Sequence, residues 1–522
     1  MSERIAVLDF GSQYTPLIAR RLREKGVLAE ILPHDAALDR VLTADLRGLI
    51  LSGGPSSVHE AGSPRPVEGL LEAVTERGIP VLGVCYGMQL LNHLGGGTVV
   101  SHTHREYGRA RLAVEHPGPL LGGLDADTRV WMSHGDRLEV LAPGFEVLAR
   151  TTDGVLAAFA NPGRRHFGVQ FHPEVTHTVQ GGQLLDNFLF EICGCRGGWS
   201  VASYLDESIA AIREQVGSNP VVVLVSGGVD STVVAAVLAR ALPPGQVHAI
   251  HVDSGLMRHD ESAGVMRALQ VLGLQNFHLV EAQADFLADL AGITDPETKR
   301  KRIGDRFIEV QERALKSLGL DGETVYLGQG TLYTDLIESG ATGSQTATIK
   351  THHNVGTPLV KAKRAAGMLV EPLSGLFKDE VRALGRHLGV PRDLLMRHPF
   401  PGPGLAVRIL GEITAERLAL LRHADRIFME CLHEANLYEA IWQAFAVLLP
   451  VRAVGVQGDG RTEGAVVALR AVDSIDGMTA DFHPVPFEVL GKVASRLVNE
   501  VRGINRVVFD VTSKPPGTIE WE

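Results

Sequence analysis

A cysteine between two glycines marks one place where this sequence could do chemistry. Residues 83–87 read GVCYG; they follow the apolar run IPVLGV and precede MQLLNHLGG, which has helical character. G-x-C-x-G at a strand-to-helix turn is the nucleophile-elbow pattern, with cysteine in place of serine. The glycines permit the strained turn, and the N-terminus of the helix favours a thiolate. A buried structural cysteine is the alternative for a lone cysteine, but the elbow favours Cys85 as a nucleophile.

A cysteine nucleophile needs a base, and the base needs a group that orients it. Residues 167–174 read FGVQFHPE and offer both groups. In an extended strand, residues two apart point the same way, so the carboxylate of Glu174 can reach the ring of His172. The chain has 21 histidines, so the H-P-E context, and not the residue type alone, favours His172 as the base.

Such a site also needs donors for the oxyanion that forms when the thiolate attacks a carbonyl. Residues 52–55 read SGGP and follow the apolar run GLIL. We predict that the backbone amides of Gly53 and Gly54, together with the amide of Tyr86, stabilise this oxyanion. An ordinary glycine turn is the alternative for SGGP on its own.

A second reactive stretch lies at residues 224–234, LVSGGVDSTVV, after a β-branched run. Strand, glycine turn and helix place backbone amides and a helix N-terminus around a phosphate. Unlike G-x-x-x-x-G-K-[ST], the loop has no lysine and has Asp230 instead. The predicted phosphate-binding residues are Ser226, Gly227, Gly228, Val229, Asp230, Ser231 and Thr232.

A bare phosphate would meet a like charge at Asp230, so we predict that Mg²⁺ mediates there and that Asp230 is a metal ligand. A role as helix N-cap is the alternative for this aspartate. A lysine that could complete the site lies far along the chain, for example Lys378 in GLFKDEVR.

Both motifs sit among short apolar strands that alternate with helical patterns through the first two thirds of the chain. That alternation predicts an α/β fold with mainly parallel sheets and helices on both faces. Beyond it, a long helix at about residues 414–435, several strands and a further helix predict a smaller α+β domain.

Two joints divide the chain. Residues 193–200, CGCRGGWS, are rich in glycine, and residues 398–404, HPFPGPG, cannot be helical because of their prolines. A chain of this length suggests about three domains. We therefore predict domains at residues 1–195, 196–397 and 398–522.

Composition limits the function classes. A net charge of −11, from 50 basic and 61 acidic residues, argues against a nucleic-acid binder driven by phosphate attraction. No apolar run reaches the roughly 18 residues that span a bilayer. The four cysteines are too few for a disulfide scaffold. We expect a soluble, cytoplasmic protein that binds neither nucleic acid nor membrane and acts on small molecules.

The cysteine elbow, the H-P-E stretch and MSHGD at residues 132–136 resemble the class I glutamine amidotransferases over about the first 195 residues. In that family a cysteine attacks the side-chain amide of glutamine, ammonia leaves, and water hydrolyses the thioester. The resemblance implies that Cys85 is the nucleophile, His172 the base and Glu174 its orienting group. It also implies glutamine-binding roles for Gln89, Ser133 and His134.

SGGVDS resembles the loop of the N-type ATP pyrophosphatases, an adenine-nucleotide α-hydrolase-like fold whose members cleave ATP between the α and β phosphates. The resemblance implies that the ligand of the loop is ATP, with Lys378 as a further contact. It also places Asp253, in the strand-end HVDSG, near the nucleotide.

Further stretches resemble the glutamine-hydrolysing GMP synthetase family over essentially the whole chain: GQGTLYTDLIES, THHNVGTP, HPFPGPGLAVRILGE and the ending TSKPPGTIEWE. The resemblance implies a C–N ligase that turns xanthosine 5′-monophosphate (XMP), ATP, glutamine and water into GMP, AMP, diphosphate and glutamate. The intermediate would be adenylyl-XMP, aminated by ammonia released at Cys85. The C-terminal domain would form a homodimer. The implied XMP contacts are Arg300, Asp459, Lys514, Ile519 and Glu520.

The sequence leaves three alternatives. A glutamine-dependent NAD synthetase uses the same ATP chemistry but a different glutaminase, so the Cys85 elbow disfavours it. A CTP synthetase-like enzyme shares the elbow but activates its carbonyl by phosphorylation. A non-catalytic nucleotide sensor would be expected to have lost one of the motifs. Residues 329–358, rich in glycine and threonine, could form a lid over the nucleotide.

Overall fold

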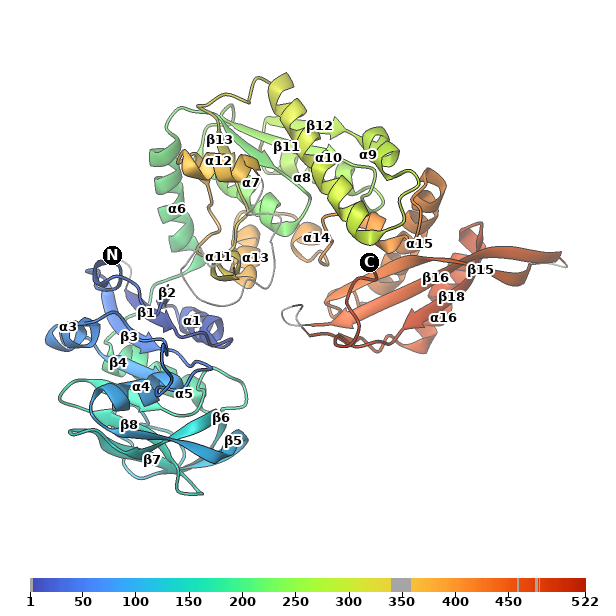
Figure 1. The fold of residues 1–522 in the computed structure, drawn as a ribbon. Coiled ribbons are helices and arrows are strands. Elements are labelled where there is room, and N and C mark those ends of the chain that lie inside the picture. Colours follow the sequence, from blue (N-terminus) through green and yellow to red (C-terminus); the bar gives the residue numbers. More distant parts are fainter. Residues whose placement is uncertain (1–2, 339–357, 458–459, 475–476, 478) are drawn as a thin grey trace. The chain divides into compact units, whose positions relative to one another are not determined.

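The computed structural model describes residues 3–338, 358–457, 460–474, 477 and 479–522. The chain divides into two compact units, Met1–Asp206 with Leu332–Gly356, and Glu207–Thr331 with Thr357–Glu522 (Figure 1). None of the described helices is long and apolar enough to cross a membrane.

The first unit is built on a mixed sheet of nine strands in the order β2-β1-β3-β4-β9-β8-β7-β5-β6. The five strands from β2 to β9 in this order are parallel, and the remainder pair antiparallel. The strands are β1 (Arg4–Asp9), β2 (Leu28–Pro33), β3 (Leu46–Leu51), β4 (Val81–Val84), β5 (Thr98–Val114), β6 (Asp127–Val140), β7 (Glu146–Thr151), β8 (Leu156–Asn161) and β9 (His166–Val169). The antiparallel half is a feature that the alternation of strands and helices did not predict.

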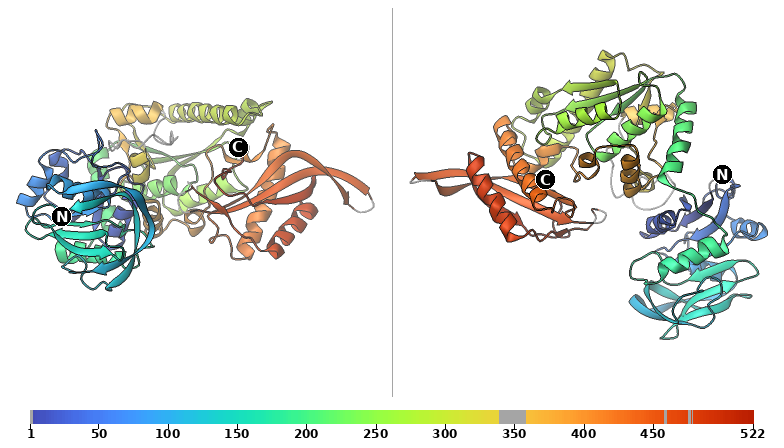
Figure 2. Two further views of the ribbon diagram at one scale, coloured as in Figure 1. Left: turned by 60° about the horizontal axis from the view of Figure 1, so that its bottom comes forward. Right: turned by 180° about the vertical axis from the view of Figure 1, so that it is seen from behind.

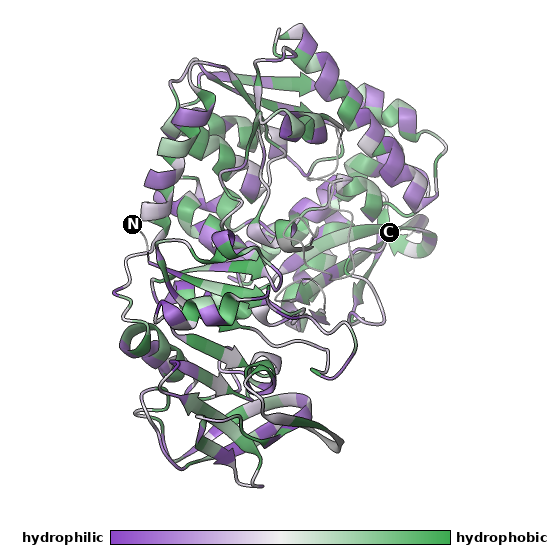
Figure 3. Ribbon diagram, turned by 60° about the vertical axis from the view of Figure 1, so that its left-hand side comes forward, coloured by the Kyte–Doolittle hydropathy of each residue, from purple (hydrophilic) through white to green (hydrophobic). Residues whose placement is uncertain are grey.

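The helices of this unit are α1 (Thr15–Glu24), α2 (Leu38–Val41), α3 (Leu70–Glu76), α4 (Tyr86–Leu94), α5 (Gly181–Asp186), the π-helix η1 (Asn187–Ile192) and α11 (Tyr333–Glu338). Figure 3 shows hydrophobic residues along the strands of this unit, mixed with hydrophilic ones, and helices that carry both kinds of residue. Strand β1 is buried along its whole length, as expected for a central parallel strand covered on both faces.

Pairing of the parallel strands brings the predicted site residues to one edge. Leu51 at the end of β3 pairs with Gly83 in β4, and Val84 at the end of β4 pairs with Val169 in β9. Because neighbouring parallel strands end at the same edge of a sheet, the turns after β3, β4 and β9 meet there. These three turns hold SGGP, Cys85 and the H-P-E stretch.

The second unit contains a parallel sheet in the order β12-β11-β10-β13-β14. Helices α7 and α8 contact one side of it and α10 and α12 the other, as Figure 2 shows. The elements are α6 (Val201–Val216, which begins in the first unit), β10 (Val221–Leu224), α7 (Val229–Ala241), β11 (Val247–Asp253), α8 (Glu261–Val271), β12 (Asn276–Glu281), α9 (Gln283–Leu290), α10 (Pro296–Ser317), β13 (Tyr326–Gly328), α12 (Pro358–Ala365), β14 (Leu369–Val370), α13 (Lys378–His387) and α14 (Arg392–Leu395).

The order of this sheet reverses at β10, because the chain runs outward to β11 and β12 and then returns to β13 on the other side. Ligands of open α/β sheets bind at the carboxyl ends of the strands beside such a reversal. The predicted phosphate loop follows β10 directly, and Asp253 ends β11.

The C-terminal part of the second unit is α+β, as predicted. Its sheet has β16 paired antiparallel to β15 and β17 and parallel to β18. Helices α15 and α16 pack on it, and their apolar residues form one core with α10. The elements are the 3₁₀-helix η2 (Gly404–Arg408), α15 (Ala415–Glu434), β15 (Gln443–Gln457), β16 (Gly460–Asp473), β17 (Asp481–Phe482), α16 (Phe487–Glu500) and β18 (Ile504–Asp510).

The α/β fold class predicted from the sequence is confirmed: one mixed sheet with a parallel half, one parallel sheet and a smaller α+β segment. The first, glycine-rich joint lies between η1 and α6, and the second, proline-rich joint lies between α14 and η2 except for Gly404, which begins η2. The domain boundaries placed at these joints remain a prediction.

Candidate active sites

Cys85 occupies a strained turn between β4 and α4. Its backbone has φ 51° and ψ −105°, a conformation that costs energy for a non-glycine residue. A side chain on Gly87 would clash with the carbonyl oxygen of Leu51. The glycine of the elbow is therefore required by a close backbone approach, and the strain holds the buried thiol at the sheet edge.

Cys85, His172 and Glu174 lie together at this sheet edge. His172 Nδ1 donates to Glu174 Oε1 at 2.7 Å, and a Cβ built on Gly53 would lie close to both Cys85 Cβ and His172 Cε1. His172 and Glu174 are 3% and 1% exposed, so solvent screens this pair little.

The charge of His172 is stabilised by its neighbours. Burial by itself lowers the pKa of His172, but the charge of Glu174, together with smaller contributions from Cys85 and from the hydrogen bond to Glu174, outweighs it and raises the pKa to about 10. The imidazole is thus protonated at neutral pH beside the sulfur. This arrangement suits a nucleophile whose base can donate a proton to a leaving amine.

The SGGP turn lies against the reacting groups. A Cβ built on Gly53 would lie 3.6 Å from Cys85 Cβ and 3.3 Å from His172 Cε1. Tyr86 is the first residue of α4, where backbone N–H groups lack an intrahelical acceptor. Gly53 therefore lies beside the reacting groups, and the role of the amides of Gly53, Gly54 and Tyr86 in stabilising an oxyanion remains a prediction.

The residues implied for glutamine binding gather around the same sulfur. Cys85 Sγ donates to the carbonyl of Ser133 at 3.6 Å. Gln89 Nε2 donates to the Asp136 carbonyl at 3.0 Å, and His134 Nδ1 donates to that carbonyl at 2.8 Å. Burial lowers the pKa of His134, so a neutral ring lies near the charged His172.

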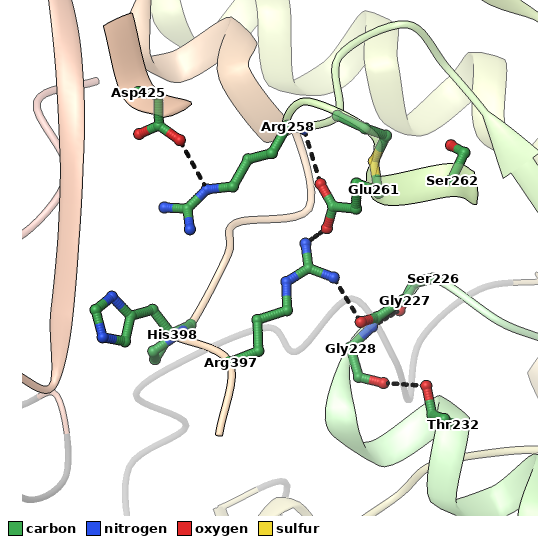
Figure 4. A network of polar contacts seen from close by, with 12 residues as sticks. Ser226, Gly227, Gly228, Thr232, Arg258, Glu261, Ser262, Arg397, His398 and Asp425 are labelled. Atoms are coloured by element: carbon green, nitrogen blue, oxygen red, sulfur yellow. Dashed lines mark hydrogen bonds and ion pairs between the residues drawn. The ribbon is translucent and has the colours of Figure 1, made fainter. Parts of the chain in front are cut away.

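The predicted phosphate loop is held by hydrogen bonds of its own (Figure 4). Gly228 N–H donates to Ser226 Oγ at 3.3 Å, and Ser226 N–H donates to Ser231 Oγ at 3.2 Å. Thr232 Oγ1 donates to the Gly228 carbonyl at 2.9 Å. Helix α7 begins at Val229, so its N-terminus faces the loop.

Lys378, the first residue of α13, contacts the predicted phosphate loop, and its contact with ATP remains a prediction. Its Nζ donates to both carboxylate oxygens of Asp230, at 2.5 and 2.6 Å. The two residues are 148 positions apart. Asp230 and the hydroxyls of Ser226 and Ser231 offer oxygen ligands, the type that Mg²⁺ takes together with substrate phosphates, so these residues fit the metal. Asp253, at the end of β11, accepts hydrogen bonds from Gly255 N–H and Gln283 Nε2.

Three of the implied XMP contacts lie around the chain's last residues. Arg300 Nη2 donates to the carbonyl of Glu522, and Glu520 pairs with Arg408 at 2.8 Å. The carbonyl of Ile519 accepts from Arg470 Nε at 2.9 Å. Lys514 instead donates from Nζ to the Gly477 carbonyl at 2.7 Å, and Asp459 lies outside the described residues.

Comparison with known proteins separates the candidate activities. Residues 6–192 match the family described as glutamine amidotransferase class-I, residues 201–296 match asparagine synthase, and residues 430–521 match the GMP synthase C terminal domain. Proteins named GMP synthase (glutamine-hydrolyzing) from Mesorhizobium japonicum and Rhizobium johnstonii are 50% and 51% identical, over 100% of this chain and 99% of theirs. The chain belongs to the glutamine-hydrolysing GMP synthase family. A relative with this name from Heliobacterium modesticaldum is 49% identical over the same shares.

Two residues of the amidotransferase domain lie near Cys85 and His172 but belong to none of the predicted motifs. Gln170 Nε2 donates to Cys85 Sγ at 3.6 Å and its Oε1 accepts from Gln89. Gln170 directly follows β9 and stands two residues before His172, so it could have been found by its closeness to the H-P-E stretch. The ring of Tyr14 lies 4.9 Å from the His172 ring; no local pattern marks it.

The second unit likewise holds buried cations that no motif predicted. Arg408, Arg470 and Lys299 are all 0% exposed. Lys299 Nζ donates to the Ile409 carbonyl at 2.8 Å and pairs with Glu522. In the basic run of residues 299–302, Lys299 is thus structural, whereas Arg300 is partly exposed.

Glu174→Gln is expected to lower glutaminase kcat by roughly 10²-fold, because the amide orients His172 without stabilising its charge. Loss of the carboxylate lowers the pKa of His172, so the alkaline limb of the activity profile moves to lower pH. A raised folded-state pKa contributes stability that is fully present below the ordinary value of 6.5 and is lost as pH rises through about 10. The stability gap between wild type and variant should therefore shrink from pH 6 to pH 10.

The measurement is glutamate release at saturating glutamine across this pH range, with thermal unfolding in parallel. Glu139→Gln is the matched control, because Glu139 is an exposed glutamate on β6. An alkaline limb that stays at the wild-type pH in Glu174→Gln would contradict the role of Glu174.

Proposed function

We propose that the two sites divide glutamine-dependent GMP synthesis between them, with ammonia formed at Cys85 and XMP activated at the SGGVDS loop. The observation that carries this proposal is that Cys85 lies beside the hydrogen-bonded pair of His172 and Glu174 at one sheet edge, in a chain that aligns end to end with glutamine-hydrolysing GMP synthases. A lysine-free loop at a strand reversal supplies the second site.

In the first half-reaction, the sulfur of Cys85 attacks the side-chain amide carbon of glutamine. The backbone amides of Gly53, Gly54 and Tyr86 stabilise the oxyanion, and protonated His172 gives its proton to the departing nitrogen. Ammonia leaves and a thioester remains. Water, deprotonated by His172, then attacks the thioester, releasing glutamate and restoring the thiol.

In the second half-reaction, the 2-oxygen of XMP attacks the α-phosphorus of ATP, and the bond to the bridging oxygen of the β-phosphate breaks. The loop amides and hydroxyls of residues 226–232 hold the departing diphosphate, and Lys378 adds a positive charge. Ammonia attacks C2 of the adenylyl-XMP, and AMP leaves with the former 2-oxygen. GMP is the product.

Mg²⁺ bound at Asp230 would neutralise phosphate charge, and it remains part of this proposal. Arg300, Lys514, Ile519 and Glu520 are the proposed XMP contacts, supported by the clustering of cations around residues 519–522. A homodimer is supported by exposed valines on β15 and β18, where Val456 and Val508 are 77% and 41% exposed. A cytoplasmic location stays a prediction from the low cysteine content.

The test supplies purified protein with ATP, Mg²⁺, XMP and either glutamine or ammonium, and follows GMP, AMP and diphosphate by chromatography. We expect stoichiometric AMP, diphosphate and GMP with both nitrogen donors. ADP and inorganic phosphate as products would contradict the role of the loop, and product formation without XMP would contradict the substrate. Light scattering of the same protein tests the dimer.

A further inference from the structure

Arg397 reaches the phosphate loop from the connector between α14 and η2 (Figure 4). Its Nη1 donates to the carbonyl oxygen of Gly227 at 2.6 Å, across 170 positions of sequence. Its guanidinium also pairs with Glu261, the first residue of α8. The Arg397 and Glu261 side chains are 11% and 6% exposed, so the contact is buried behind the loop. The proposed reaction assigns no role to Arg397.

The carbonyl of Gly227 is the backbone group that decides where the loop's amides point. Gly227 has φ +83°, and a side chain there would lie 2.8 Å from Val265 Cγ2 and 3.1 Å from Arg397 Nη1. Since a trans peptide is planar, the Gly227 carbonyl and the Gly228 N–H point in opposite directions. A carbonyl anchored on Arg397 therefore turns the Gly228 N–H away from Arg397, to the side of Ser226 Oγ.

Arg397 is itself fixed by a relay that ends in the C-terminal part of the unit. Glu261 Oε2 accepts from Arg258 N–H at 2.8 Å, and Arg258 pairs with Asp425 of α15 at 3.1 Å. Asp425 Oδ1 accepts from Ala446 N–H of β15 at 3.1 Å. Figure 4 shows this succession from the loop to α15.

Packing and hydrogen-bond contacts also hold the connector around Arg397. The ring of Phe400 lies 5.4 Å from the Arg397 guanidinium, and His398 stacks on Tyr438 at 3.9 Å. His398 Nε2 donates to the Tyr438 carbonyl and its Nδ1 accepts from Ala444 N–H. Burial lowers the pKa of Arg397 to about 10, which leaves it charged at neutral pH.

We propose that Arg397 is a positioning residue for diphosphate binding: by holding the Gly227 carbonyl, it aims the loop's amides at the β and γ phosphates and places a positive charge behind a loop that has no lysine. Arg397 acts through the backbone of Gly227 and does not touch the phosphates. The relay through Glu261, Arg258 and Asp425 ties this geometry to α15 and β15. The inference rests on the proposed assignment of the loop to ATP.

The deciding variant is Arg397→Lys, which keeps a cation beside Glu261 but has no planar fork to bond Glu261 and Gly227 together. We expect the KM for MgATP and the inhibition constant of inorganic diphosphate to rise about tenfold, the value of one charge-assisted hydrogen bond. The KM for XMP and the melting temperature should stay near wild type. All rates are measured with ammonium, so that the glutaminase does not enter.

A second measurement keeps the proposal testable if the lysine variant is unstable. In Arg397→Ala, guanidinium chloride at a few millimolar should restore diphosphate binding, and sodium chloride at equal concentration should not. Arg392→Lys is the matched control, because Arg392 lies nearby in α14 and forms an exposed ion pair with Glu439. This variant should leave the KM values for MgATP and XMP and the inhibition constant of diphosphate unchanged.

Three outcomes separate the possibilities. The proposal is supported if Arg397→Lys raises the KM for MgATP and the inhibition constant of diphosphate without changing the KM for XMP, and if guanidinium restores diphosphate binding in Arg397→Ala. An Arg397→Lys protein that binds MgATP and diphosphate like wild type overturns it, as does a variant in which the constants for MgATP and XMP and the melting temperature all change together. Wild-type protein that releases no diphosphate from ATP would instead contradict the proposed function.

Discussion

Cys85→Ala is expected to abolish glutamine-driven GMP synthesis, by at least about 10³-fold, and to leave the ammonium-driven reaction within about twofold of wild type. Alanine removes the sulfur that would form the thioester, and no oxygen or nitrogen nucleophile replaces it. The synthetase site is unaffected, because the loop and its partners belong to the other unit. The measurement is GMP formation with each nitrogen donor at saturating MgATP and XMP.

Cys195→Ala is the matched control for this variant, since Cys195 is a second buried cysteine of the same unit. It should keep both reactions. Undiminished glutamine use by Cys85→Ala would refute the assignment of the nucleophile. Loss of both reactions in a protein that still melts like wild type would refute the separation of the two half-reactions.

Asp230→Asn should lower ammonium-driven GMP synthesis by roughly 10²-fold or more, with glutaminase activity measured without ATP unchanged. The substitution removes the one carboxylate in the phosphate loop, and it leaves Lys378 without the partner that it holds through both oxygens. Asparagine keeps the shape of the side chain, so the loss reports charge. The concentration of Mg²⁺ needed for half-maximal rate should rise, because an amide is a weaker ligand for this ion than a carboxylate.

Asp321→Asn is the control, because Asp321 is an exposed aspartate of the same unit. It should leave the rate and the Mg²⁺ requirement at wild-type values. If Asp230→Asn keeps the wild-type rate and Mg²⁺ requirement, Asp230 is only the first-turn acid of α7 and the metal lies elsewhere.

Local patterns predicted much of both candidate sites because simple backbone rules govern them. G-x-C-x-G predicted the elbow, since the glycine after Tyr86 must lie against the carbonyl of Leu51. The H-P-E stretch predicted the 2.7 Å bond between His172 and Glu174, although the extended strand assumed there was wrong, because β9 ends at Val169 and a turn follows. SGGVDS after β10 predicted a loop at a helix N-terminus. Each of these inferences needs fewer than ten consecutive residues.

The antiparallel half of the first sheet was not predicted, because strand pairing joins segments whose sequences do not specify each other. Gln170 could have been found from its spacing to His172, whereas Tyr14 could not, since only the packing of α1's leading turn brings it to that ring. Arginines usually lie on the surface, yet Arg408 and Arg470 are both 0% exposed. They are buried beside Glu520 and Ile519, near the last residues of the chain.

By itself, the sequence determined the reactive groups and the elements that carry them, because these depend on residue type, helix and strand periods and glycine turns. Only the tertiary structure decided which distant groups complete each site. Lys378 meets Asp230 across 148 residues and Arg397 meets Gly227 across 170. Such contacts depend on the order of strands in a sheet and on the packing of a connector against a loop. A local sequence pattern predicts neither the strand order nor this packing.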